Sequence, residues 1–385
     1  MLFEPVELKD QKARIVVVGV GGGGGNALNR MIEDGMGSVD FIAINTDAQD
    51  LEVNNSQIKL QIGRELTKGL GAGADSEVGS LAVQENKEII INELESADMV
   101  FITAGMGGGT GTGAAPEISK ISKELGILTV GIVTKPFVFE GPKRTKRALD
   151  GIEDMKKNCD TLLVIPNETL LEITDDNTTV NQSFKLADSV LHQACKGISD
   201  LINKPGLINL DFADVRTVMK DMGDALMGTG LAQGEERAIL AAQEAINSPL
   251  LVDSNIGGAK GLLVNISGPE SMTIHELNAA SKVIYNEAGP DANIILGCVI
   301  DENLDNEIKV TVIATGLNDD YKSLSINKTI EVESISKDSM TIENKKEDTG
   351  IKNEIVSNTS SDSKEEDILT FGDDHDVPAF IRNRS

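Results

Sequence analysis

Two glycine clusters that lie far apart in the sequence have the residue types of an anion-binding site. One runs from Gly19 to Asn26 and the other from Gly105 to Gly113, and each follows an apolar, β-branched segment and precedes a helical pattern. Glycine lets the backbone approach a ligand closely and adopt positive φ. A turn that leads into a helix N-terminus directs unpaired N–H groups at an anion. We therefore expect the two turns to hold a polyphosphate from both sides.

The first cluster is a weak signal by itself. Gly19, Gly21 and Gly24 fit the pattern G-x-G-x-x-G, which dinucleotide-binding enzymes share. The letters that follow, N-A-L-N, lack the lysine and the hydroxyl residue of a P-loop, so backbone N–H groups would hold the phosphates. A tight strand–helix turn without a ligand is the alternative. The unbroken run from Gly21 to Gly25 argues against it, because glycine carries a high backbone-entropy cost.

The second cluster is much more specific. Residues Gly107 to Gly113 spell G-G-G-T-G-T-G, the motif G-G-G-T-G-[TS]-G of tubulin-type GTPases. From about Arg14 to Gly316 the chain resembles the FtsZ family of bacterial tubulin-like division GTPases. The resemblance implies GTP or GDP as the bound nucleotide. It places the following residues around the phosphates and the adjoining nucleotide: Gly22, Gly23, Gly24, Gly25, Asn26, Gly109, Thr110 and Gly111.

The same resemblance implies which residues contact the sugar of the nucleotide. Glu140 and Arg144 match positions that contact ribose and phosphate, and Asn167 matches another sugar-side position. A carboxylate accepts hydrogen bonds from ribose hydroxyls, and a guanidinium group suits phosphate oxygens. Pro142 stands where the family often has a lysine or a similar residue, but the glutamate and the arginine remain in register.

Phe184 and Asp188 would recognise the base. They fall one helical turn apart. The resemblance implies that Phe184 stacks on the base and that Asp188 accepts from guanine N1–H and N2–H₂, donors that adenine does not present in that arrangement. Residue types alone would favour a core aromatic and a solvated helix charge.

The segment from Asn209 to Arg216 resembles the loop that completes the site in this family. Asp211 and Asp214 are three residues apart at a helix start, so both can face one side; helix capping by Asp211 is the alternative. The resemblance implies that this loop comes from the next subunit. Asp211 and Asp214 would orient or polarise the attacking water, with Asn209 near the phosphate or its cation. Mg²⁺ would bridge phosphate oxygens.

A site divided in this way makes the contact between subunits heterologous. Such a contact repeats head to tail and produces an open filament unless it closes. The expected function is therefore a homopolymer whose GTP hydrolysis depends on assembly, and the resemblance implies that its filaments form the cytokinetic ring at mid-cell.

The elements predict an α/β fold. Apolar strands alternate with helical patterns in the first half, which is typical of a doubly wound, mainly parallel sheet. A long helix over 179–203 connects it to a smaller α+β lobe. Expected strands are 14–18, 39–44, 99–103, 127–133 and 161–165, then 225–230, 261–267, 294–300 and 308–314; expected helices are 26–34, 80–95, 114–125 with Pro116 in the first turn, 233–247 and 273–288; residues 63–79 are expected to form a long loop.

Composition changes near residue 317, where Ser, Asn, Asp, Glu and Lys become dominant and periodicity is lost, which favours a disordered linker. The peptide Asp373–Ser385 joins an apolar cluster to two arginines, as a short binding motif would; a frayed terminus is the alternative. We expect it to bind a membrane adaptor and division regulators. The predicted parts are an extension at 1–12, a GTP-binding domain at 13–178, the connecting helix at 179–203, the carboxylate loop and its helix at 204–221, an α+β domain at 222–317, the linker at 318–372 and the peptide at 373–385.

Charge and composition restrict the partners. The formal net charge of −27 argues against a general nucleic-acid or anionic-membrane surface, and hydrophobic content of 40% allows a sizeable core. The three cysteines lack paired spacing, and the histidines are too scattered for a metal site. Neither a signal peptide nor a membrane-spanning run is evident. We expect a cytoplasmic protein, recruited to the division site without direct membrane insertion.

Three alternatives remain. A nicotinamide or flavin oxidoreductase would use the first cluster, with Asp47 near the spacing of a ribose-binding acid; the second cluster argues against it. A non-catalytic nucleotide-binding scaffold would not need Asp211 and Asp214. A relative that partitions plasmids or shapes cells belongs to the same class, and the peptide Val377–Arg382 favours the division protein instead.

Overall fold

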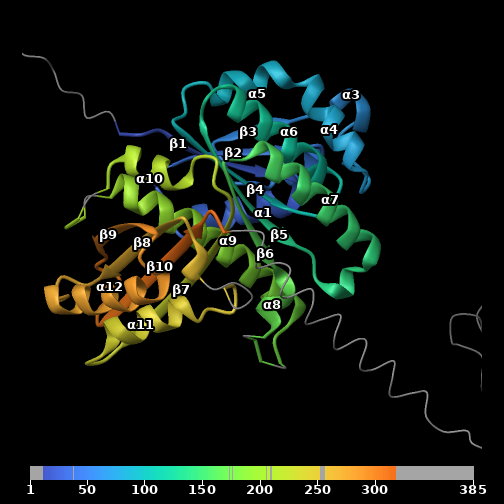
Figure 1. Cartoon of the computed structure of the whole chain (residues 1–385). Coiled ribbons are helices and arrows are strands. Elements are labelled where there is room, and N and C mark those ends of the chain that lie inside the picture. Colours follow the sequence, from blue (N-terminus) through green and yellow to red (C-terminus); the bar gives the residue numbers. More distant parts are fainter. Residues whose placement is uncertain are drawn as a thin grey trace, which may run out of the picture. The chain divides into compact units, whose positions relative to one another are not determined.

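In the computed structural model of this chain, the residues described are 12–317 apart from 38, 173, 176, 205, 209 and 252–255. All of them belong to the first of two compact units, Met1–Thr329 and Ile330–Ser385. Their strands form a ten-stranded sheet in the order β3-β2-β1-β4-β5-β6-β7-β10-β8-β9, seen in Figure 1. The predictions for residues 1–11, Asn209, the linker 318–372 and the peptide 373–385 lie outside the described residues.

The first six strands pair in parallel, as predicted for a doubly wound sheet. Most of their residues are buried on both faces, because continuous apolar segments exclude water from both sides of a parallel sheet. The strands are β1 (Ile15–Val20), β2 (Asp40–Asn45), β3 (Ile58–Gln61), β4 (Met99–Gly105), β5 (Leu128–Lys135) and β6 (Thr161–Pro166).

Helices cover the two faces of this sheet. Alternate strand residues point to opposite faces, so Val17 and Phe101 pack with α1 (Gly21–Glu33) and α9 (Val180–Asn203). Val16 and Val100 pack in a second core on the other side. The helices of that second core are α4 (Ser76–Glu85), α5 (Lys87–Leu94), α6 (Thr110–Glu124) and α7 (Pro142–Asn158).

The second half adds an antiparallel and mixed sheet with its own core. Strand β10 pairs antiparallel with β7 and β8, and β8 pairs parallel with β9. The first residues of β7 also pair in parallel with β6, from Thr161↔Gly223 to Leu163↔Ala225, so the two lobes share one continuous sheet. Its elements are α10 (Phe212–Met219), β7 (Gly223–Gln233), α11 (Arg237–Ile246), η2 (Ile256–Gly258), β8 (Gly261–Gly268), α12 (Ile274–Ala288), β9 (Asn293–Ile300) and β10 (Glu307–Thr315).

Two helices begin earlier than the sequence analysis predicted. Helix α1 starts at Gly21 rather than near Asn26, so the glycine run is helical and not a loop. Helix α6 starts at Thr110 rather than at residue 114, which puts Pro116 beyond the first turn. In both cases packing against the sheet outweighs the low helix propensity of glycine.

The predicted loop over 63–79 and helix over 80–95 are also corrected. Helix α3 (Arg64–Thr67) and the first residues of α4 occupy much of the expected loop. The expected helix is divided at Asn86, whose side-chain oxygen accepts from the Gly63 N–H at 2.9 Å. Short elements with too few residues to show a period were not predicted: α2 (Ala48–Glu52), β3, η1 (Val138–Glu140) and α8 (Asn167–Leu171). The seventeen-residue helix α7 was not predicted either.

Candidate functional site

The two glycine turns meet at the carboxyl end of the parallel sheet. Strands β1 and β4 are neighbours, with Val20 opposite Ala104, so both turns leave the same edge. A Cβ added to Gly21 would lie 3.0 Å from the Gly111 nitrogen, which shows that the turns touch. Gly21 and Gly107 adopt φ of 70° and 99°, which favours glycine. The N-termini of α1 and α6 therefore lie side by side, and such unpaired N–H groups can together bind an anion.

The glycines of the first run divide into two groups. A Cβ on Gly24 would lie 2.4 Å from the Thr103 carbonyl oxygen, and one on Gly23 would lie 3.1 Å from Gly105 Cα. These two glycines let α1 lie directly against β4. Gly22 and Gly25 face the other way, and with Asn26 they line a small pocket beside β2 and α2.

A loop with unusual backbone conformation covers the second turn. Gly69, Gly71, Gly73 and two other residues between 68 and 74 have positive φ. A Cβ on Gly109 would lie 2.8 Å from Ala72 Cβ, so this loop leaves no room for a side chain there. We call residues 68–75 the covering loop.

Arg147 fastens the covering loop, and the sequence analysis did not identify it. Its Nη1 donates to the Ala74 carbonyl oxygen at 2.9 Å and its Nε to the Gly107 carbonyl oxygen at 3.2 Å. The basic run at the start of α7, K-R-T-K-R, was the signal that could have drawn attention to it.

Hydroxyl groups shape the second turn from within. Thr112 Oγ1 accepts from the Gly107 N–H at 2.8 Å and closes the turn. Thr110 Oγ1 lies 2.6 Å from Thr46 Oγ1, which follows β2. Thr110, a residue expected at the nucleotide, therefore also connects α6 to the end of a neighbouring strand.

Glu140 and Arg144 lie beside this turn. Glu140 Oε1 accepts from the Phe137 N–H at 3.0 Å, and its Oε2 is 3.0 Å from Arg144 Nε. A Cβ on Gly107 would lie 2.7 Å from Arg144 Cγ, so the arginine stem rests on the second glycine turn. The pair is therefore in place to contact a nucleotide whose phosphates occupy the turns.

Asn167 follows directly after β6, which pairs with β5. Its side chain is buried, with 4% of the residue exposed. Within the described part of the chain its Oδ1 has no hydrogen-bond donor. A buried acceptor without a partner is costly, and a hydroxyl or amino group of a bound nucleotide would satisfy it.

The base-side residues lie on the first turns of α9. Phe184 is 39% exposed, and its ring stands edge-to-face with Phe137 at 5.4 Å between centroids. Burial raises the pKa of Asp188 to about 6, against the opposing effect of the Arg30 charge. A desolvated carboxylate of this kind gains from the N–H donors of guanine.

Asp211 and Asp214 lie at the opposite end of the parallel strands from the glycine turns. Both are exposed, and Asp211 precedes α10 without making a side-chain capping hydrogen bond. Arg216 of α10 donates to the Gly126 carbonyl oxygen, just before β5, whereas Glu140 follows the far end of that strand. The eight residues of β5 span ~26 Å. The structure therefore does not bring the two aspartates to the glycine turns of their own chain.

Comparison with known proteins decides the family. The model of the Tubulin/FtsZ family GTPase domain matches residues 14–175, and that of the FtsZ family C-terminal domain matches residues 223–318. An empty FtsZ dimer from M. jannaschii is 47% identical with a TM-score of 0.77, and 80% of this chain and 90% of that one are covered. A mutant FtsZ from M. jannaschii gives the same identity and TM-score, with 93% of that chain covered. The chain belongs to the FtsZ family.

The fold extends to more distant relatives. CetZ1 from Haloferax volcanii, a GDP-bound monomer, is 20% identical with a TM-score of 0.69, and 82% of this chain and 99% of that one are covered. This likeness concerns the fold alone. The expected resemblance and fold class are thus confirmed, and the glycine turns belong to the GTPase domain of an FtsZ-family protein.

Membership of the FtsZ family argues against the oxidoreductase alternative. In the structure, Asp47 caps a helix, whereas in an oxidoreductase it would bind ribose. Asp47 Oδ1 accepts from the Gln49 N–H at 2.9 Å and caps α2. Among the helices that are described, none has the length and apolar character needed to span a membrane.

Proposed function

We propose that this protein is a self-assembling GTPase in which the GTP of one subunit is hydrolysed with carboxylates from the next. One observation carries the proposal: the anion site and the exposed Asp211 and Asp214 lie at opposite ends of the parallel strands. A head-to-tail contact would join these two ends, and because it is heterologous it would repeat into a filament.

Each predicted residue has a role in this arrangement. Backbone N–H groups at the starts of α1 and α6 bind the phosphates. Glu140 and Asn167 accept from the sugar, while Arg144 contacts phosphate. Phe184 and Asp188 select guanine.

The chemistry of hydrolysis is positioning and electrostatics. Asp211 and Asp214 polarise and orient the water, and Asn209, which lies outside the described residues, approaches the phosphate. No group of three His, Cys, Asp or Glu side chains in the described ranges could hold a metal ion alone. Mg²⁺ in nucleotide sites is bound largely by phosphate oxygens and water, which is how we propose it is held in this protein.

Apolar side chains support a contact at both ends. Leu70, Val138 and Phe139 are exposed around the nucleotide end, and Leu207 and Ile208 are exposed in the segment that leads to Asp211. The M. jannaschii FtsZ structure is described as a dimer and CetZ2 from Haloferax volcanii as a GTPγS-bound protofilament. We extend this type of self-association to the present chain.

In the cell, the filaments would form the cytokinetic ring. The protein would be cytoplasmic and recruited to the division site at mid-cell. The peptide Asp373–Ser385 would bind a membrane adaptor and division regulators, with residues 318–372 setting its reach.

The test is GTP turnover per subunit against protein concentration, with pelleting in parallel. A shared concentration threshold is expected. Turnover that is the same at every dilution contradicts the proposal. Asp214→Ala should bind GTP with unchanged affinity and hydrolyse it about 100-fold more slowly. Glu88→Ala, which removes an exposed carboxylate from α5, a helix that contributes no residue to either proposed face, should behave as the natural protein.

A further inference from the structure

Helix α6 connects the two halves of the proposed site within one subunit. Its first residue, Thr110, belongs to the second glycine turn, and its last turn contains Lys123. The fifteen residues of the helix span ~22 Å. The end that carries Lys123 reaches the edge of the sheet where α10 lies.

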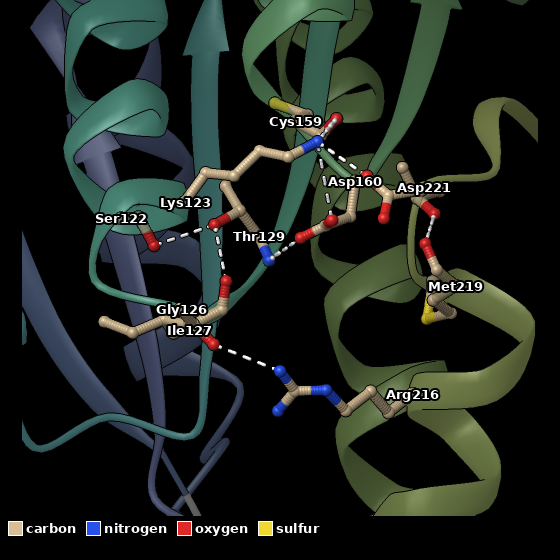
Figure 2. A network of polar contacts seen from close by, with 11 residues as sticks. Ser122, Lys123, Gly126, Ile127, Thr129, Cys159, Asp160, Arg216, Met219 and Asp221 are labelled. Atoms are coloured by element: carbon tan, nitrogen blue, oxygen red, sulfur yellow. Dashed lines mark hydrogen bonds and ion pairs between the residues drawn. The ribbon is translucent and has the colours of Figure 1, made fainter.

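Lys123 connects three chain segments at that edge (Figure 2). Its Nζ is 2.8 Å from Asp221 Oδ1 and 3.6 Å from Asp160 Oδ1, and it donates to the Cys159 carbonyl oxygen at 3.4 Å. Asp221 lies just beyond the C-terminal end of α10 and adopts φ of 54°. The ion pair therefore holds the chain at the point where it leaves α10.

Asp160 makes this link rigid. It is 3% exposed, and its Oδ2 accepts from the Thr129 N–H of β5 at 2.8 Å. A buried carboxylate needs a charged or hydrogen-bonding partner, and Lys123 supplies the charge. Burial is the largest influence on the pKa of Lys123 and lowers it, but the Asp221 hydrogen bond and both carboxylate charges together raise it.

Other hydrogen bonds hold helix α10 in place. Arg216 donates to the Gly126 carbonyl oxygen at 3.1 Å, and Thr315 Oγ1 donates to that of Val218 at 2.7 Å. Thr161 Oγ1 donates to the Met219 carbonyl oxygen. The N-terminal end of α10, in contrast, lacks a capping bond from Asp211. The orientation of the helix is therefore set mainly from its C-terminal end.

We propose that Lys123 is a positioning residue for the carboxylates that α10 presents to the next subunit. By pairing with Asp160 and Asp221 it fixes the end of α10, and thereby the location of Asp211 and Asp214 at its beginning. Because α10 is ~12 Å long, a tilt of about 10° at one end moves the other by about 2 Å, and a displacement of about 1 Å already costs on the order of 100-fold in rate. This inference rests on the proposed function.

The first test compares Lys123→Met with Lys120→Met, which removes the same charge from an exposed position on the same helix. We expect Lys123→Met to bind GTP and to pellet with a non-hydrolysable analogue as the natural protein does. Its turnover per pelleted subunit should fall about 10-fold or more, and Lys123→Arg should recover most of it. Normal turnover in Lys123→Met contradicts the inference.

The second test locates the defect by mixing subunits. Asp214→Ala has an intact pocket and a defective donor, so a subunit with a defective pocket and an intact donor should rescue it. Asp188→Ala is such a subunit and serves as the control, because its pocket is defective and its Asp211 and Asp214 are intact. If Lys123→Met weakens the donor, its equal mixture with Asp214→Ala should turn over GTP at no more than the mean of the separate rates. A mixture faster than this mean places the defect in the pocket and overturns the inference.

Mixing Asp188→Ala with Asp214→Ala distinguishes a failure of the divided site from a failure of the role proposed for Lys123. If Asp188→Ala and Asp214→Ala fail to rescue each other, the divided site itself is wrong. If they do and Lys123→Met also rescues Asp214→Ala, only the role of Lys123 is wrong. Should Lys123→Met not fold, Asp221→Asn removes the exposed partner and leaves Asp160 paired. It should lower turnover about two- to threefold, as expected for the loss of one exposed ion pair, without rescuing Asp214→Ala. Natural turnover in that variant counts against the inference.

Discussion

Arg147 Nη1 donates to the carbonyl oxygen of Ala74 at 2.9 Å, and this bond attaches α7 to the covering loop. The second donor of the same side chain holds the Gly107 carbonyl oxygen. One arginine thus connects the loop above the second glycine turn to the turn itself. The arrangement favours a pocket that is preorganised before the nucleotide arrives, which lowers the entropic cost of binding.

We expect Arg147→Met to weaken GTP binding. Loss of two partly exposed bonds should cost about 1 kcal/mol, or roughly a fivefold higher Kd, because the covering loop must then be ordered on binding. Isothermal titration of the monomer measures this. Lys146→Met, on the exposed side of the same turn, is the control, and equal affinities for the two variants would show that the clamp has no effect on the pocket.

The two groups of glycines in α1 should respond differently to alanine. Gly24→Ala places a Cβ 2.4 Å from the Thr103 carbonyl oxygen, so α1 must move away from β4, and we expect a loss of about 1–3 kcal/mol in unfolding free energy. Gly22→Ala meets only the Asp50 carboxylate at 3.1 Å, and its main effect should be on nucleotide affinity. Urea unfolding and GTP titration of both variants separate stability from binding.

Binding of guanine nucleotide should weaken in acid because of Asp188. Its pKa of about 6 in the free protein means that the carboxyl group is half protonated at that pH and mostly protonated below it. Guanine donors bind the carboxylate, so the proton must leave on binding and affinity falls as pH falls, by up to about tenfold per pH unit. GDP titrations between pH 5 and 7.5 measure this. Asp188→Asn should bind more weakly and lose this part of the pH dependence; an unchanged profile would contradict the role of Asp188.

His192 should make the fold less stable in acid. Its Nδ1 lies 3.1 Å from Asp34 Oδ2, connecting α9 to α1, and burial lowers its pKa to about 4, against the opposing charge of Asp34. Between that value and its ordinary pKa of 6.5, the unfolded chain binds a proton that the folded protein does not. Unfolding free energy should therefore fall by roughly 2 kcal/mol from pH 7 to pH 5 on this account.

The control for that measurement is His192→Gln, which cannot take up a proton. Urea unfolding of both proteins at pH 5 and pH 7 gives the difference due to the histidine. If the two proteins lose the same free energy in acid, His192 is not the group responsible.

Much of the fold was predictable because its signals are local. The continuous apolar segments of β1, β4 and β5 and the long period of α9 appear within single stretches of sequence, and each was predicted close to its observed place. The starts of α1 and α6 were predicted late, because glycine has low helix propensity and contacts with β4 outweigh it. Short elements such as α2 and η1 have too few residues to show a period.

The sequence by itself determined the two glycine turns, the alternation of strand and helix, and the resemblance to a tubulin-like GTPase, since all three depend on neighbouring residues. Only the tertiary structure decided that β6 and β7 continue one sheet, that Arg147 clamps the covering loop, and that Asp211 and Asp214 lie a full strand length from their own pocket. These features depend on contacts between residues far apart in the chain. Strand order and packing set such contacts, and local residue patterns do not encode them.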